Sequence, residues 1–161
     1  MPLNPKLDSN PRDYRILVVD DETAVLDVMQ EILRSVGWSV DAYASPVAAL
    51  KKVKHTRFDA LLLDLYMPEM PGLLLHAKLR VADRELFDRT IFVSGHFSSE
   101  ELRKALEGTP RFVPKPFRAE VLVSAVSYAL SATPRVKAAG SGASAGAAEH
   151  EGAGSSSSRA S

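Results

Sequence analysis

The chain has 161 residues, of which 45% are apolar and 25% are charged, a composition typical of a globular protein with one folded domain. Lys plus Arg equals Asp plus Glu at 20 each, so no net charge attracts the whole protein to nucleic acid or to an anionic membrane. The absence of cysteine excludes disulfide scaffolds, thiolate metal sites and cysteine nucleophiles.

The two ends of the chain differ in composition from its middle. Residues 1–13 hold three prolines and no apolar run, so we expect neither a signal peptide nor a membrane span there, and we expect a cytoplasmic protein. From Ala138 onward, 20 of the final 24 residues are Ala, Ser or Gly, which contribute little to a packed core. We therefore expect an N-terminal arm over 1–13, a folded domain over 14–132 and a disordered Ala/Gly/Ser-rich tail over 133–161.

Strand and helix patterns alternate between these ends. Short apolar runs predict strands at 16–19, 38–43, 58–64, 90–93 and 111–113. Apolar residues at helical spacing predict a helix after each strand, over 25–36, 46–53, 74–82, 98–106 and 122–130. Five strand-then-helix units predict an α/β fold, a doubly wound parallel sheet in the order 2-1-3-4-5 with helices on both faces.

Several local signals refine this prediction. The apolar stripe expected on the first helix comprises Val25, Val28, Met29, Ile32 and Val36. The stripe expected on the last helix comprises Leu122, Ala125, Val126, Ala129 and Leu130. Ser98 and Glu101 have capping-box spacing at the start of the fourth helix. Pro114 cannot donate to a sheet ladder, so the last strand is expected at a sheet edge.

Residues able to do phosphate or metal chemistry stand at the carboxyl ends of the predicted strands. They are Asp20, Asp21, Asp64, Ser94 and Lys115. In an open parallel sheet the ligand crevice lies at this edge, where the strand order reverses, here between the first and third strands. The three aspartates are therefore expected to converge.

Such a cluster restricts the chemistry. Two carboxylates about 4 Å apart repel by roughly 4 kcal/mol at an effective dielectric constant near 20, so three of them need a cation or a raised pKa. Mg²⁺ prefers hard oxygen ligands of this kind. With an ammonium and a hydroxyl added, the site suits phosphoryl transfer, in which a carboxylate can be the nucleophile.

Each residue alone has a simpler interpretation. Asp20 and Asp21 could cap a helix, Asp64 and Ser94 could belong to turns, and Lys115 could be exposed. These interpretations together require all five residues to reach one edge by chance, so we favour a site. Nearby, His96 is expected to border it. The basic cluster Lys51-Lys52, with Lys54, is interpreted as a solvated helix face and not as a nucleic-acid patch.

Four motifs, in this order and spacing, resemble the receiver domain of two-component response regulators over about residues 13–132. They are Val18-Val19-Asp20-Asp21-Glu22, Leu63-Asp64-Leu65-Tyr66-Met67-Pro68-Glu69-Met70-Pro71-Gly72, Val93-Ser94-Gly95-His96 and Pro114-Lys115-Pro116-Phe117. The resemblance implies a flavodoxin-like fold and implies that Asp64 accepts a phosphoryl group from a phosphohistidine on a sensor kinase or phosphotransfer protein.

The resemblance also implies a role for each residue of the site. Asp20, Asp21, Asp64 and the Tyr66 carbonyl would hold Mg²⁺. Ser94 would hydrogen-bond the phosphoryl group, and Lys115 would pair with it.

Members of this family use an aromatic residue as a conformational switch. In this sequence the aromatic residue would be Phe112, which lacks the hydroxyl of a tyrosine, and Ser94 would act together with it. A cis Lys115–Pro116 bond is implied as well. Pro71 departs from the family pattern, in which many members carry an acid before the glycine.

We therefore expect a signalling module that assists its own phosphorylation and dephosphorylation, and not a turnover enzyme. Only 29 residues follow Ala132, so we expect a single-domain, chemotaxis-regulator-like protein whose output passes through contacts with an effector protein. A homodimer is a further option, and direct binding to nucleic acid or membrane is not expected.

Two alternative functions remain open. One is a phosphatase of the haloacid-dehalogenase type, with Asp20 as nucleophile and Glu22 as second acid. The other is a pseudo-receiver that binds partners without phosphate.

Overall fold

The structure is a computed structural model that describes residues 14–97, 99–106 and 111–132. The expected arm (1–13), the expected tail (133–161) and the expected capping residue Ser98 lie outside the described residues.

A five-stranded parallel sheet forms the centre of the molecule, in the order β2-β1-β3-β4-β5. Its strands are β1 (Arg15–Val19), β2 (Ser39–Tyr43), β3 (Ala60–Leu63), β4 (Thr90–Ser94) and β5 (Phe112–Pro114). The predicted strand order is confirmed, and so is the edge position of the strand that contains Pro114. The reversal of strand order falls between β1 and β3, as expected for a doubly wound sheet.

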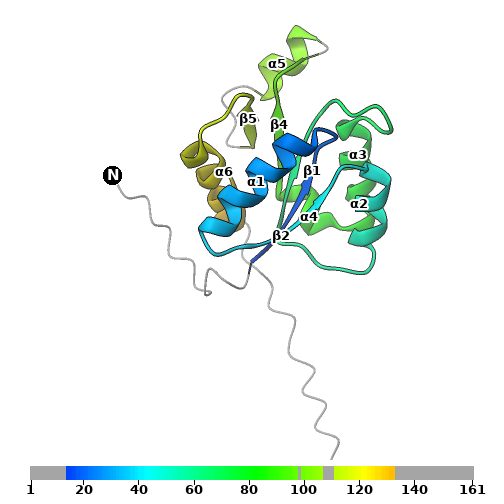
Figure 1. Ribbon diagram of the computed structural model, residues 1–161. Helices are drawn as coiled ribbons and strands as arrows, with labels where there is room; N and C mark the ends of the chain where they lie inside the picture. The colour runs from blue at the N-terminus through cyan, green and yellow to red at the C-terminus, as the bar shows by residue number, and fades with distance from the viewer. Residues whose placement is uncertain (1–13, 98, 107–110, 133–161) are drawn as a thin grey trace, which may run out of the picture.

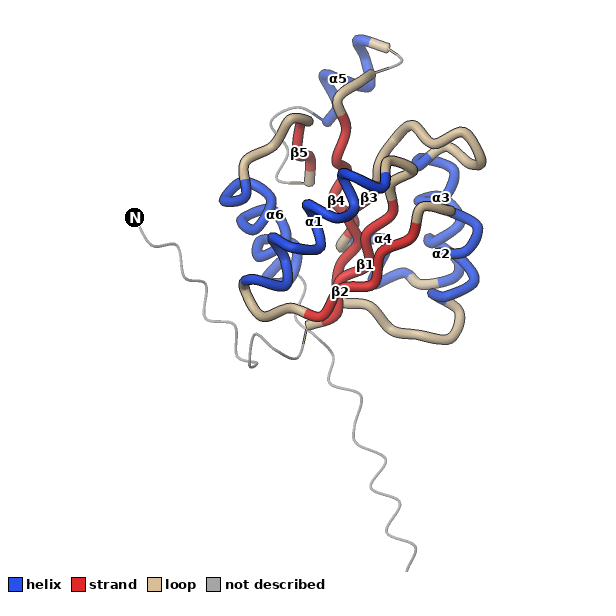
Figure 2. Tube along the Cα trace, viewed as in Figure 1, coloured by secondary structure: helices blue, strands red, loops and turns tan. Residues whose placement is uncertain are grey.

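Helices cover both faces of this sheet (Figures 1 and 2). They are α1 (Thr23–Ser35), α2 (Pro46–Val53), α3 (Gly72–Ala82), α4 (Arg84–Asp88), α5 (Glu100–Leu106) and α6 (Ala119–Ala132). The layer of α1 and α6 lies on one face, and the layer of α2, α3 and α4 lies on the other.

Alternate side chains of each strand supply the two cores. In β1, Ile16 and Val18 pack toward α1 and α6, whereas Leu17 and Val19 pack toward α2 and α3. All four side chains are at most 1% exposed. Burial on both faces explains why β1 is a continuous apolar run instead of an alternating one.

The helix predictions are confirmed in part. The stripe predicted for α6 is buried at all its positions. The stripe predicted for α1 is wrong for Val28 and Val36, which are 48% and 39% exposed. The buried face of α1 is instead Leu26, Met29 and Leu33. This sequence carries two overlapping apolar stripes, and periodicity alone does not tell which of them meets the sheet.

Side-chain caps mark the starts of α4 and α5. The short helix α4 was not predicted, although Asp83 marks its start by accepting a hydrogen bond from Leu86 N at 3.0 Å. At α5 the Ser99 hydroxyl accepts a hydrogen bond from Leu102 N at 3.1 Å. The helix predicted there is present, and its described cap lies one residue after the predicted one.

Replacement of Gly72 tests how tightly the start of α3 is packed. A Cβ atom at this position would overlap the main-chain carbonyl of Asp64, which is backbone and cannot rotate away. We expect Gly72→Ala to lower the free energy of unfolding by roughly 2–4 kcal/mol in urea titrations. Gly95→Ala is the control, because its Cβ would meet Lys115 at an ordinary 3.4 Å, and a change below about 0.5 kcal/mol is expected. Equal effects of the two substitutions would contradict the close approach at Gly72.

Candidate functional site

Backbone hydrogen bonds bring the predicted site residues to one edge of the sheet. Asp64 N donates to Val19 O at 3.0 Å, which extends the β1–β3 ladder by one residue and places Asp64 beside the end of β1. On the other side, Lys115 N donates to Ser94 O at 3.0 Å, so β5 delivers the lysine beside the end of β4. The Lys115–Pro116 peptide bond is cis, as the resemblance implied.

Three carboxylates meet at this edge. One oxygen from each of Asp20, Asp21 and Asp64 lies within 4.8 Å of the others. Asp20 is fully buried and Asp64 is 5% exposed, whereas Asp21 faces solvent. The predicted convergence of the three aspartates is therefore present.

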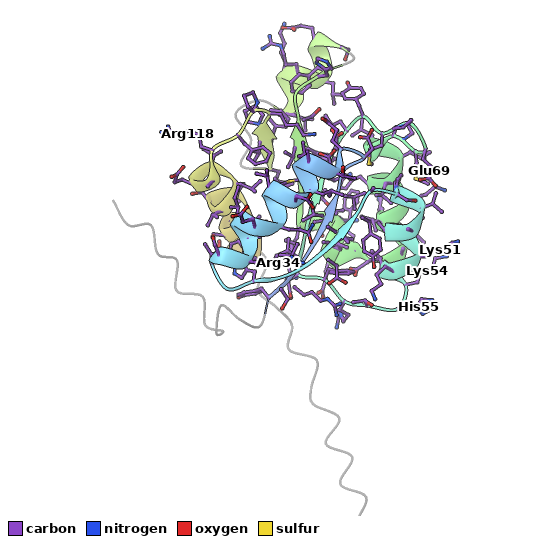
Figure 3. All side chains as sticks on the ribbon, viewed as in Figure 1. Arg34, Lys51, Lys54, His55, Glu69 and Arg118 are labelled. Atoms are coloured by element: carbon purple, nitrogen blue, oxygen red, sulfur yellow. The ribbon has the colours of Figure 1, made fainter. Side chains whose placement is uncertain are left out.

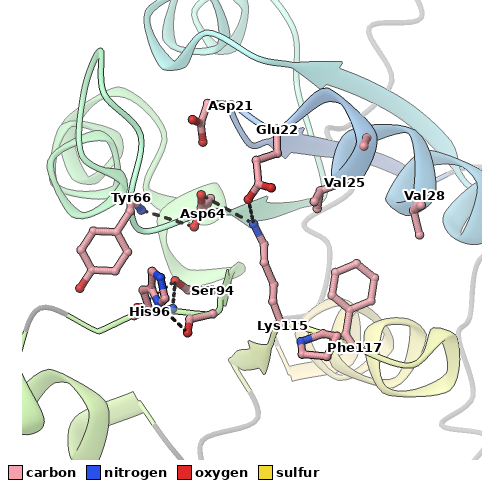
Figure 4. A pocket seen from close by; sticks show the side chains of 13 residues that line it. Asp21, Glu22, Val25, Val28, Asp64, Tyr66, Ser94, His96, Lys115 and Phe117 are labelled. Atoms are coloured by element: carbon pink, nitrogen blue, oxygen red, sulfur yellow. Dashed lines mark hydrogen bonds and ion pairs between the residues drawn. The ribbon is translucent and has the colours of Figure 1, made fainter.

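Lys115 is the cation that faces this cluster (Figure 4). Its Nζ lies 2.6 Å from Asp20 Oδ2, 3.4 Å from Glu22 Oε1 and 3.7 Å from Asp64 Oδ2. Its closest pairing is thus with Asp20 and not with Asp64. The pairing with Glu22 was missed, although this acid directly follows Asp20 and Asp21 in the sequence.

Burial dominates the electrostatics of the site. Burial raises the pKa of Asp20, and the hydrogen bond from Lys115 offsets this only in part. Burial likewise raises the pKa of Asp64. The Lys115 charge lowers this pKa only in part, and the charges of Asp20 and Asp21 raise it further. Burial disfavours the charged form of Lys115, but its three carboxylate neighbours together raise its pKa. The single positive charge of Lys115 therefore does not balance the charges of the carboxylates around it, while Lys115 itself remains a protonated ammonium.

An open cleft of about 760 Å³ gives access to Asp64. Tyr66 and His96 stand on one side of it, which confirms that His96 borders the site (Figure 4). Val25, Val28 and Phe117 contribute apolar side chains on the opposite side. Val28, which was expected on the buried stripe of α1, is exposed because it lies on the wall of this cleft.

Ser94 lies in the cleft, whereas Phe112 lies outside it. Ser94 lines the cleft and is 1% exposed, but its hydroxyl donates to His96 O at 3.0 Å within its own loop. Phe112 does not line the cleft. It is half-buried, and its ring centroid lies 5.2 Å from that of Phe97.

The residues present fit a divalent cation. The ligand atoms are carboxylate oxygens only, the donor type that Mg²⁺ prefers. One of the three acids is exposed and would leave coordination positions for water or a phosphate oxygen. The Tyr66 nitrogen lies 3.4 Å from Asp64 Oδ1, so the main chain of Tyr66 runs beside the acid cluster.

Comparison with known proteins assigns the family. The response regulator receiver domain family matches residues 16–127, and the chain belongs to this family. It is 36% identical over 129 residues to the response regulator protein TmoT of Ectopseudomonas mendocina, an alignment that covers 80% of this chain and 58% of TmoT. The chain thus spans little more than half the length of the curated relatives that it matches.

Solved structures agree with this assignment. A CheY-like response regulator receiver domain protein from Methanospirillum hungatei JF-1 superposes with a TM-score of 0.66 at 30% identity, over 74% of this chain and 94% of that one. The beryllofluoride-activated NtrC4 receiver domain dimer gives a TM-score of 0.64 at 28% identity, over 73% of this chain and 97% of that one. Receiver domains are signalling modules and not turnover enzymes. Within the described residues, no helix has both the length and the apolar character required to cross a membrane.

Removal of the Asp64 charge is expected to stabilise the protein in metal-free buffer. A carboxyl whose pKa is raised on folding contributes stability that is fully present below its unfolded pKa and is lost as pH rises through its folded pKa. Ionised Asp64 therefore destabilises the fold at neutral pH. We expect Asp64→Asn to raise the free energy of unfolding there by about 1 kcal/mol.

The pH dependence supplies the check on this expectation. Below about pH 4 the wild-type carboxyl is protonated in both states, so the gain should disappear. Asp27→Asn, at an exposed position of α1, serves as the control and should change the stability by less than about 0.5 kcal/mol. A wild-type protein more stable than Asp64→Asn at neutral pH would show that Lys115 outweighs burial.

Proposed function

We propose that this protein is a response regulator whose Asp64 accepts a phosphoryl group in a Mg²⁺-dependent reaction. The observation that carries the proposal is the position of Asp64, a nearly buried carboxylate that lines the open cleft, clusters with two further acids and lies 3.7 Å from the Lys115 ammonium. An accessible carboxylate beside a fixed cation suits in-line transfer of a phosphoryl group.

The proposed transfer is a simple displacement. An Asp64 oxygen attacks the phosphorus of a phosphohistidine on a sensor kinase or phosphotransfer protein. The new O–P bond forms as the N–P bond breaks, and the imidazole nitrogen of the donor takes the electron pair and then a proton. Mg²⁺ held by Asp20, Asp21, Asp64 and the Tyr66 carbonyl would neutralise the phosphoryl oxygens.

Three other side chains have proposed roles in the phosphorylated state. Lys115 would pair with a phosphoryl oxygen, because it lines the cleft and its ammonium lies 3.7 Å from the Asp64 carboxylate. Ser94 would donate its hydroxyl to another phosphoryl oxygen. Its hydroxyl now donates to His96 O, so the proposal requires a rotation about its side-chain torsion. Phe112, beside Phe97 and next to β4, would respond to that change as the switch residue.

The proposed output is a change in protein–protein contacts. Phosphorylation would shift a pre-existing equilibrium between two surface arrangements, and an effector protein would bind one of them. A second copy of the chain is an alternative partner. The reaction would take place in the cytoplasm, in a receiver domain that comprises residues 14–132. The domain would also catalyse its own dephosphorylation, without turnover of free substrates.

The geometry favours Asp64 over Asp20 as the nucleophile. A phosphatase of the haloacid-dehalogenase type would use Asp20, but both oxygens of Asp20 are engaged at shorter distances than those of Asp64, for which the contacts are 3.7 Å and 3.4 Å. Oδ2 lies 2.6 Å from Lys115 Nζ, and Oδ1 accepts from Glu22 N at 2.9 Å. Asp20 is fully buried, whereas Asp64 lines the cleft. Turnover of a phosphate ester that is lost in Asp20→Asn and kept in Asp64→Asn would establish the phosphatase instead.

Phosphorylation by a small donor tests the proposal directly. Incubation with acetyl phosphate and Mg²⁺ should add one phosphoryl group to the protein, measured by intact mass spectrometry. We expect none in Asp64→Asn or after chelation of Mg²⁺, and wild-type incorporation in Asp27→Asn, which removes an exposed α1 carboxylate outside the cleft. An unlabelled wild-type protein in the presence of Mg²⁺ would favour the phosphate-independent pseudo-receiver.

The lifetime of the phosphorylated protein should depend on Tyr66 and His96. Both side chains border the cleft beside Asp64, where they restrict the approach of water to a phosphoryl group. In the double variant Tyr66→Ala/His96→Ala, we expect loss of phosphate to be about threefold faster or more, because water reaches the phosphorus more readily. The half-life is measured after removal of acetyl phosphate, with Val121→Ala on α6 as control. An unchanged half-life would exclude a screening role.

A further inference from the structure

Helix α3 has an apolar surface on the side that faces away from the sheet. Its inner side packs into the core through Leu75 and Leu79, which are 1% and 0% exposed. Its outer side carries Leu73, Leu74, Ala77 and Val81, which we name the α3 outer stripe. Leu73, Leu74 and Val81 are 43%, 48% and 93% exposed. A surface helix normally has polar residues opposite its buried face, so α3 departs from the usual pattern.

The spacing within the stripe suits another helix. Leu74, Ala77 and Val81 are separated by three and then four residues, which aligns them along one line of the helix surface. A line of this kind packs against an amphipathic helix with the same spacing. The small Ala77 in the middle permits close approach of the two helix axes.

Charge around the stripe specifies the partner. Lys78 and Arg80 flank it, and neither has a carboxylate within 4.0 Å among the residues that the structure describes. Neither α3 nor the neighbouring α2 contains an acidic residue. Lys51 projects from α2 at the same side of the molecule, where the exposed acid Glu69 belongs to the loop before α3 (Figure 3). Positive charge without internal partners favours a partner with acidic flanks.

Residues 1–13 and 133–161 do not have the composition of such a partner. Residues 133–161 contain a single large apolar side chain, Val136, and residues 1–13 contain three prolines, which oppose an amphipathic helix. In a twofold pairing of two α3 helices centred on Ala77, the Lys78 side chains of the two copies would face each other. This repulsion disfavours a second copy as the occupant.

We propose that the α3 outer stripe is a docking site for an acidic amphipathic helix of a partner protein. The surface is separate from the cleft, because no residue of α3 lines the cleft that contains Asp64. Docking here adds a second contact surface to the proposed phosphorylation site and does not require phosphate.

A designed peptide pair tests this proposal on the full-length chain. One labelled helical peptide carries leucines at the three-and-four spacing with glutamates on both flanks, and its partner peptide carries lysines in place of the glutamates. Fluorescence anisotropy should show saturable binding of the acidic peptide and none of the basic one. Binding should weaken at least about tenfold in Leu74→Glu/Val81→Glu and in Lys78→Glu/Arg80→Glu.

Val121→Glu is the matched control, since Val121 is 45% exposed on α6 and its substitution should leave peptide binding unchanged. Circular dichroism melting verifies that each variant is folded before binding is measured. Absence of acidic-peptide binding, or equal binding by all folded variants, would overturn the proposal. Concentration-dependent dimerisation that is lost in Leu74→Glu/Val81→Glu would overturn it too, because the stripe would then bind a second copy. None of these measurements uses phosphate, so their outcome is independent of Asp64 phosphorylation.

Discussion

The close pairing of Lys115 with Asp20 is the interaction on which the rest of the site depends. Asp20 is fully buried, and an isolated buried carboxylate is costly unless a cation or several hydrogen bonds accompany it. Lys115 Nζ at 2.6 Å and Glu22 N at 2.9 Å supply those partners. One ammonium still faces three aspartates, and the raised pKa values of Asp20 and Asp64 show that compensation is incomplete. A site left short of positive charge attracts a divalent cation.

The fold maintains this unfavourable arrangement through two buried, paired strands. β1 and β3 are buried along their paired length, so the acids at their carboxyl ends are attached to backbone that has little freedom to separate. The Asp64 N–Val19 O hydrogen bond continues the ladder into the site. Repulsion between like charges is then opposed by the packing of the whole sheet, and not by local contacts alone. This is why the stability of the protein and the chemistry of its cleft are expected to oppose one another at Asp64.

The sequence predicts the sheet and the convergence of the acids well, because both follow from rules that do not involve side-chain detail. Alternating buried strands and helices require parallel topology, and that topology brings residues after β1, β3, β4 and β5 to one edge. The buried face of α1 could not be predicted, since its two apolar stripes overlap and only packing against the sheet selects Leu26, Met29 and Leu33. The hydroxyl direction of Ser94 and the pairing of Glu22 with Lys115 depend on side-chain torsions, which periodicity and motif spacing do not encode.

The start of α3 links the proposed phosphorylation site to the α3 outer stripe. Gly72 packs against the Asp64 carbonyl, and its N–H donates to Leu65 O at 2.9 Å, so the first turn of α3 is bonded to the segment that carries Asp64. A displacement of the backbone at Asp64 must therefore move this turn, because no space separates the two. The inner residues Leu75 and Leu79 are fully packed, and a helix held so closely responds as a rigid body. A helix that moves as a rigid body carries the outer stripe with it unchanged, so a partner bound there meets the same surface whatever the position of the Asp64 backbone, which agrees with docking that does not require phosphate.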